Sequence, residues 1–234
     1  MIPNHLPHIS RAEVQEITNS VSRAIMRSVK KRLEMHGNVQ VVHAFGRNEN
    51  ICYKVFDGLM VMVAARGDAG ATEYFPSGRY HAQAKQIDLE VRENVKLAVL
   101  AKPGKWQEDL YSTLAHELTH SRDPIYKARL PRSSEPLDAK EYYRQIQERK
   151  AFTREIAEYV AKKILVYQGK PKSSWKRFGK TASMWLARAI NETSGPSVGL
   201  MLSLTDKESE RVYRDVVQFL EGEGLLAIVE AAYA

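Results

Sequence analysis

The 234-residue sequence has a single cysteine, Cys52, which excludes an intramolecular disulfide framework and a cysteine-based zinc cluster. Because it stands in an apolar run, Cys52 is expected to be a small core residue. No apolar run approaches the ~20 residues needed to span a membrane. The first residues lack the basic and apolar regions of a secretory signal peptide. We therefore expect a protein of a reducing compartment such as the cytoplasm, with no membrane partner.

Glycine and proline are also too scarce, at 13 and 9 residues, for a collagen-like or low-complexity chain. Hydrophobic residues make up 44% and charged residues 27%, which is typical of a folded globular protein. The net charge of +7 is compatible with nucleic-acid binding but does not imply it. Two stretches, Arg23–Arg32 and Lys162–Lys180, are dense in basic residues, and such stretches are more often solvated helix faces than polyanion sites.

The first part of the chain is expected to form one helix followed by a small, mostly antiparallel sheet. Ser10 and Glu13 have capping-box spacing at the start of a helix over 10–35. Apolar and β-branched runs predict strands at 39–45, 51–55, 59–65, 71–75, 86–91 and 95–100. The alternation of polar and apolar residues in Gln86–Val91 favours a half-exposed strand at the sheet edge.

The chain then becomes helical. Apolar periodicity and stop signals predict helices over 105–122, 138–167, 173–190 and 205–220, with a short terminal helix after them. The expected fold class is α+β, with a sheet lobe over 1–104 and a helical lobe over 105–234 in one compact unit. The helix over 105–122 is expected at the junction of the two lobes.

One motif carries chemistry: residues 116–120 read His-Glu-Leu-Thr-His, the pattern H-E-x-x-H, within the helix expected over 105–122. His116 and His120 are four residues apart, so both imidazoles project from one helix face and can bind one zinc ion. Glu117 lies at the flank of this pair, where its carboxylate can act as general base for a metal-activated water. The alternative is a structural helix whose histidines border the core or pair with acids.

A catalytic zinc site of this kind needs a third protein ligand. No histidine follows His120, and Asp123 is better placed to cap the helix or to orient a ligand. Three acids spaced seven residues apart share one face of the next long helix and are the better candidates: Glu141, Glu148 and Glu155. For each of them singly, the alternative is a solvated acid paired with a neighbouring base: Arg149, Lys150 or Arg154.

The motif, followed by a glutamate on a second helix, resembles the gluzincin branch of the zincin metallopeptidases. The segment 142–156 also resembles small proteins of bacteriophages and bacterial mobile elements, in which a tyrosine, E-x-x-A and E-I follow the H-E-L-T-H motif. This resemblance implies a zincin-like fold with Glu148 as third zinc ligand and Glu155 as its alternative. It covers residues 86–160.

In zincins, the edge strand before the active-site helix binds the substrate backbone, and this resemblance assigns that role to Gln86–Val91. Candidates for stabilising the developing oxyanion are Tyr142, Tyr143, Arg144 and His81. The expected function is therefore a zinc metallopeptidase acting on a peptide or protein. The alternative is a phage or virion structural protein, or a nucleic-acid-associated protein, that keeps the fold with a structural or vestigial metal. The same resemblance adds a virion to the cytoplasm as an expected location.

Overall fold

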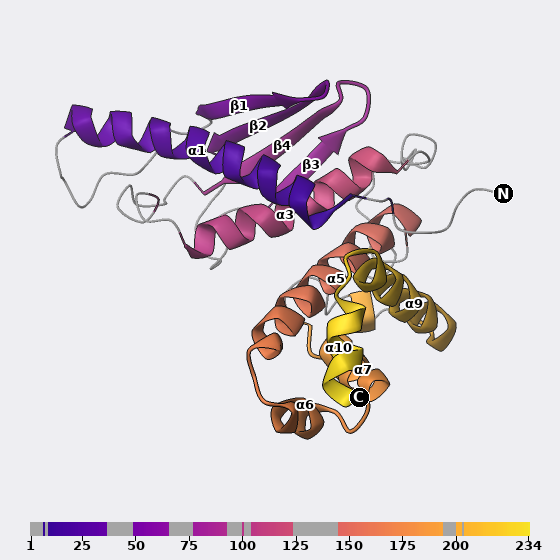
Figure 1. Cartoon of the computed structure of the whole chain (residues 1–234). Coiled ribbons are helices and arrows are strands. Elements are labelled where there is room, and N and C mark those ends of the chain that lie inside the picture. Colours follow the sequence, from indigo (N-terminus) through magenta and orange to yellow (C-terminus); the bar gives the residue numbers. More distant parts are fainter. Residues whose placement is uncertain are drawn as a thin grey trace. The chain divides into compact units, whose positions relative to one another are not determined.

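The computed structural model describes residues 7, 9–36, 49–65, 77–92, 100, 104–123, 145–193, 200–202 and 204–234. The described residues form an α+β fold, with a small mixed sheet and several helices (Figure 1). The chain divides into two compact units. The sheet unit comprises residues 9–127, and the helical unit comprises residues 1–8 and 128–234.

In the sheet unit, the described residues form four strands: β1 (Asn50–Phe56), β2 (Leu59–Ala65), β3 (Ser77–His81) and β4 (Gln86–Val91). The order across the sheet is β1-β2-β4-β3. β1 and β2 are antiparallel and joined by a turn at Asp57-Gly58, in which both residues have positive φ. β3 and β4 are also antiparallel, whereas β2 and β4 are parallel. The sheet is therefore mixed, with two antiparallel pairings and one parallel pairing.

Gln86–Val91 does form a strand, but the expectation that it lies at the sheet edge is wrong. As β4, it is paired on both sides, with β2 and with β3. Its Ile87, Leu89 and Val91 are buried, and the residues between them are only partly so. Alternation of polar and apolar residues shows that one face of a strand is buried. Interior strands and edge strands can both have one buried face, so the alternation does not distinguish them. Among the described strands, the edge on this side is β3, which the sequence analysis did not predict.

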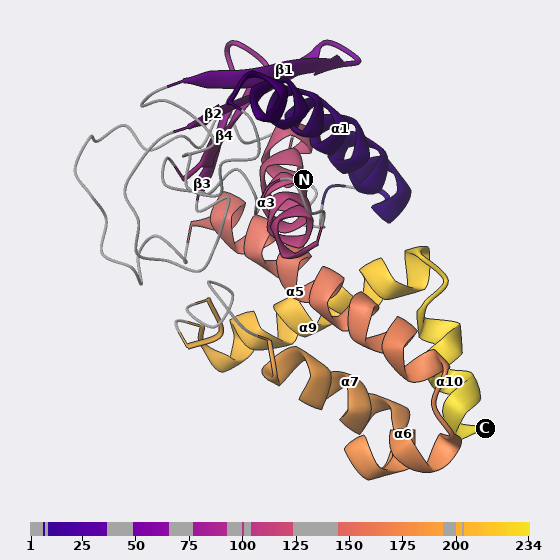
Figure 2. The same cartoon turned by 90° about the vertical axis from the view of Figure 1, so that its left-hand side faces the viewer.

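Two helices, α1 (Arg11–His36) and α3 (Lys105–Arg122), pack on one face of the sheet and against each other (Figure 2). The Ser10 hydroxyl accepts a hydrogen bond from the Glu13 backbone N–H, as its capping position predicts. Arg122 at the end of α3 pairs with Glu13 at the start of α1. One face of α1 is apolar and buried, at Val14, Ile17, Val21, Ile25 and Val29.

The division of the chain differs from the boundary expected after residue 104, since α3 belongs to the sheet unit. Its Leu110, Leu114 and Leu118 are fully buried in the core that α1 and the sheet share. The helix begins and ends where expected. Asp123 has extended backbone angles because it precedes Pro124, which disfavours helical geometry at that position.

The helical unit contains five described helices: α5 (Ile146–Gln168), α6 (Lys172–Phe178), α7 (Ala182–Asn191), α9 (Asp206–Gly222) and α10 (Leu226–Tyr233). A capping box begins α9, in which the Glu208 carboxylate accepts a hydrogen bond from the Thr205 backbone N–H. The single helix expected over 173–190 is two helices that separate at Gly179. A Cβ at Gly179 would lie 2.5 Å from the Trp185 backbone nitrogen, so this close approach needs a glycine.

Parts of some expected elements lie outside the described residues: the strands at 39–45, 71–75 and 95–99, and the helical segment 138–144. Leu100, expected at the end of a strand, is helical. No helix in the described part of the chain is both long enough and apolar enough to cross a membrane.

Candidate metal centre

The H-E-x-x-H motif lies in the most deeply buried part of α3, where every residue from Leu114 to His120 is buried. His116 is 8% exposed, Glu117 5% and His120 3%. Burying imidazole and carboxylate groups costs free energy unless they are paired or bind an ion. A helix that needed only to pack would carry apolar residues at these positions. Their burial shows that the motif does not lie on a solvated helix face.

The two imidazoles are close enough to share one ion. Their ring centroids lie 4.8 Å apart with an interplanar angle of 80°. One potential ligand atom from each of His116, Glu117 and His120 can be chosen so that all three lie within 4.8 Å of one another. Tetrahedral zinc with bonds of about 2.0–2.1 Å keeps its ligand atoms roughly 3.3 Å apart, so small side-chain rotations would close the pair around an ion. This buried group can hold a metal ion.

Glu117 is held against the edge strand of the sheet. A Cβ atom at Gly78 in β3 would lie 2.7 Å from Cγ of Glu117 and 3.0 Å from its Oε1. It would also lie 2.8 Å from Cγ2 of Thr113. The strand backbone can thus approach this side of α3 only because residue 78 has no side chain. Gly78 was not among the residues singled out from the sequence, although a glycine inside a strand is a signal of close backbone approach.

His81 is on the same strand but not on the same face. Successive side chains of a strand point to opposite faces, so Gly78 and the buried Tyr80 face α3, whereas Arg79 and His81 face away from it. On that outer face, Nε2 of His81 lies 2.9 Å from Oδ2 of Asp88 in β4. The suggestion that His81 stabilises an oxyanion beside the motif is therefore not supported by the structure.

The predicted third ligands lie in the helical unit. Glu148 is buried in the first turn of α5, and Glu155 is half-buried two turns later. The two units are not placed relative to one another, so no distance joins either carboxylate to the histidine pair. The other residues singled out near this helix, Glu141, Tyr142, Tyr143 and Arg144, lie outside the described residues.

Two basic side chains near Glu148 and Glu155 have other carboxylate partners. Arg149 lies 3.3 Å from Oε1 of Glu208 in α9. Arg154 is fully buried and donates to Oε1 of Glu158 at 2.6 Å. Each of these two arginines therefore has a glutamate partner other than Glu148 and Glu155.

No protein-family model matches this sequence, and neither the search of curated proteins nor the search of solved structures found a match.

Proposed function

We propose that this protein is a zinc-dependent metallopeptidase with a zincin-like fold. The observation that carries the proposal is the buried group of His116, Glu117 and His120, with two imidazoles one turn apart and a carboxylate at their flank. A purely structural two-histidine site has no use for a buried glutamate beside the ligands. Hydrolysis does, because a general base must stand close to the metal without binding it.

The donor set suits zinc. Neutral imidazole nitrogens with a carboxylate as third protein ligand are a common catalytic zinc set, and the fourth position stays open for water. His116 and His120 supply the two nitrogens. Glu148, with Glu155 as its alternative, is proposed as the carboxylate on the strength of the sequence resemblance. When bound, zinc lowers the pKa of its water to near 7 and polarises the substrate carbonyl.

In this proposal, Glu117 accepts the proton of the attacking water and later delivers it to the leaving amine of the cleaved peptide. Its burial suits that task, since a carboxylate with little access to solvent exchanges its proton with the reactants rather than with bulk water. The close packing of Glu117 against the backbone at Gly78 limits how far the carboxylate can turn away.

The strand proposed to bind the substrate backbone is β3, which replaces Gln86–Val91 in that role. Among the described strands, β3 is hydrogen-bonded only to β4, and it lies beside α3 (Figure 1). A peptide added to this edge would form main-chain hydrogen bonds next to Glu117. Because Gly78 has no side chain, the β3 backbone can lie close to α3 at that point.

The test is the Glu117→Gln variant, assayed for zinc content and for hydrolysis of casein and a peptide library. The amide is nearly isosteric but cannot accept a proton, so we expect unchanged zinc and a loss of turnover by about 10²–10⁴-fold. Glu108→Gln, the same change at an exposed position of α3, serves as the control and should stay active. A zinc-loaded wild type without peptidase activity would instead favour the structural or nucleic-acid-associated alternative. A fully active Glu117→Gln would overturn the mechanism.

A further inference from the structure

A long basic stretch without any acid lies in one segment of the helical unit. Residues 162–180 contain seven basic residues and no acid: Lys162, Lys163, Lys170, Lys172, Lys176, Arg177 and Lys180. The whole chain has 35 basic and 28 acidic residues, so the remainder has 28 of each and no net charge. This stretch covers the end of α5, α6 and the loop after it, and Arg23–Arg32 of α1 is a second basic stretch without an acid.

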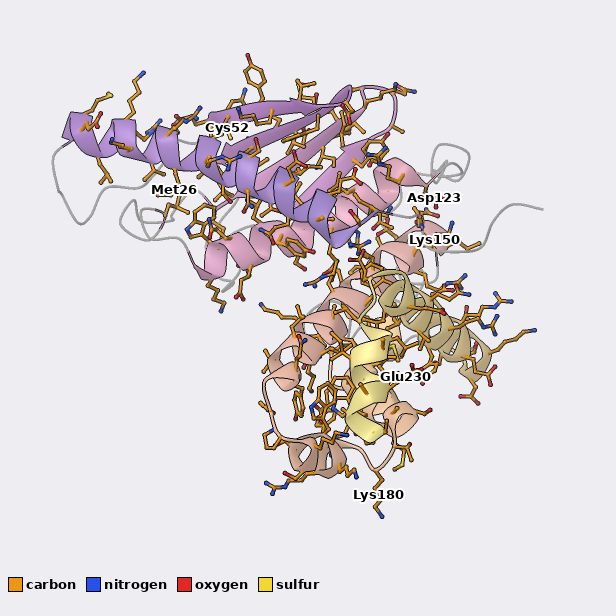
Figure 3. All side chains as sticks on the ribbon, viewed as in Figure 1. Met26, Cys52, Asp123, Lys150, Lys180 and Glu230 are labelled. Atoms are coloured by element: carbon orange, nitrogen blue, oxygen red, sulfur yellow. The ribbon has the colours of Figure 1, made fainter. Side chains whose placement is uncertain are left out.

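Five exposed cations of this segment form what we call the α6 basic surface: Lys170, Lys172, Lys176, Arg177 and Lys180. Lys170 lies over the ring of Tyr167, 4.3 Å from its centroid. The other four make no ion pair with any residue that the structure describes. Figure 3 shows the Lys180 side chain pointing away from the helices.

Other cations of the same unit are neutralised. Lys163 and Arg188 both donate to the Glu192 carboxylate, and these hydrogen bonds, that of Lys163 above all, lower the pKa of Glu192. Arg149 and Arg154 are paired with glutamates as well. Among the described residues of the unit, acids pair with these four cations, whereas none pairs with Lys172, Lys176, Arg177 or Lys180.

The short helix that carries this surface is firmly anchored. Trp175 is buried and lies 5.1 Å from Trp185 and 5.3 Å from Tyr167 between ring centroids. The Tyr233 hydroxyl lies 2.8 Å from the carbonyl oxygen of Trp175 and 2.6 Å from that of Gly179. The basic side chains are therefore displayed from a fixed backbone, which lowers the entropy cost of binding a partner.

Helix stability does not account for this charge. Lys176 and Arg177 stand in the last turn of α6, where cations interact favourably with the helix dipole. Lys172, however, is the first residue of α6, where a cation is unfavourable, and Lys170 and Lys180 lie outside the helix. Lys172 and Lys176 are one turn apart on α6, and like charges at this spacing repel one another, so the arrangement lowers stability unless an anionic partner is bound.

We propose that the α6 basic surface binds the phosphate backbone of a nucleic acid. Closely spaced lysines and arginines without acidic neighbours suit a repeating polyanion, because each cation can neutralise one phosphate and release its counterion. An anionic membrane fits less well. The apolar residues of α6, Trp175 and Phe178, pack into the core of the unit, so this helix has no exposed apolar face to enter a bilayer.

The experiment is a fluorescence anisotropy titration of labelled duplex and single-stranded DNA over a series of salt concentrations. The wild type should bind with a steep salt dependence. Neutralising Lys172, Lys176, Arg177 and Lys180 to glutamine should weaken duplex binding and reduce the slope of log K against log[salt] by about 3–4, since each phosphate contact contributes about 0.9. The melting temperature should not fall, because these side chains are exposed and the substitutions remove the repulsion between them.

A matched control removes the same amount of charge elsewhere. Four exposed cations of α1 in the other dense basic stretch are changed to glutamine: Arg23, Arg27, Lys30 and Lys31. If the surface is specific, this variant keeps the wild-type slope, as does the charge-preserving Lys172→Arg/Lys176→Arg/Lys180→Arg protein. An equal loss in the α1 variant would overturn the proposal, because net charge alone would then explain binding. So would a wild type that binds phosphatidylserine vesicles but not DNA, or neither of them.

The proposal does not depend on the peptidase activity. Glu117→Gln should bind DNA like the wild type, so the failure of one proposal leaves the other standing.

Discussion

Gly78 of β3 lies directly against Glu117 of α3, so closely that a single methyl group at position 78 would lie 2.7 Å from Cγ of the glutamate. This contact joins the edge of the sheet to the motif helix at the residue proposed as general base. The position of the Glu117 carboxylate therefore depends on the strand backbone at Gly78.

Gly78→Ala should therefore destabilise the sheet unit and impair the site. The added methyl forces Glu117 or the strand to move, and overpacking of this kind costs about 1–3 kcal/mol. We expect a lower melting temperature and reduced peptide turnover with the zinc content retained. The control is Gly169→Ala, where a Cβ would meet nothing within 4 Å. If Gly78→Ala melted and turned over substrate like Gly169→Ala, the strand would not constrain Glu117.

The histidine pair should bind about one zinc ion per chain. His116→Ala and His120→Ala should each lose the metal, because removal of either imidazole leaves too few protein ligands. His81→Ala, which changes a histidine on the outer face of the sheet, should keep it. A chelator should lower the melting temperature of the wild type but not that of His116→Ala, since a metal stabilises only the state that binds it. Elemental analysis and thermal melting test these outcomes, and a folded, zinc-supplemented wild type without metal would contradict them.

Glu148→Gln should weaken metal binding far more than Glu155→Gln, because the resemblance at residues 142–156 assigns the third ligand to Glu148. A competition titration with a zinc chelator measures both variants against the wild type. If Glu155→Gln releases the metal and Glu148→Gln does not, the ligand is two turns further along α5. The roles of His116, His120 and Glu117 would survive that result.

Cys52 should react slowly with thiol reagents in the folded protein. Burial raises the pKa of its thiol to about 11, and the nearby Lys54 opposes this only partly. The ordinary pKa of this thiol is 9.0, so at pH 8 the reactive thiolate of Cys52 should be roughly 100-fold scarcer than in the unfolded chain. Ellman's reagent, applied with and without denaturant, tests this. Equal rates in the two states would show that the thiol is not shielded.

Local signals in the sequence predicted most of the described elements of this fold. The spacing of Leu110, Leu114 and Leu118 and the Pro124 stop fix α3, and the Thr205–Glu208 capping box fixes the start of α9. The placement of His116 and His120 on one helix face follows from their spacing of four residues. These features depend only on residues within one or two turns of each other.

The features that sequence reasoning missed depend on distant partners. The parallel pairing of β2 with β4 and the edge position of β3 are set by strands that meet across the sheet. The end of α6 at Gly179 depends on close packing against Trp185. The contact of Gly78 with Glu117 likewise joins residues almost forty positions apart in the chain. No periodicity within one segment contains this information.

Each unit contains its own tryptophans, so the unfolding of each unit can be followed separately by tryptophan fluorescence. Trp106 is buried in α3 of the sheet unit, whereas Trp175 and Trp185 pack together in the helical unit. The chain contains three tryptophans, so the tryptophan fluorescence of a Trp106→Phe protein comes from the helical unit alone. The tryptophan fluorescence of a Trp175→Phe/Trp185→Phe protein comes from the sheet unit alone. Unfolding curves of these two proteins would show whether the units melt in one transition or two, and which of them loses stability when the metal is withdrawn.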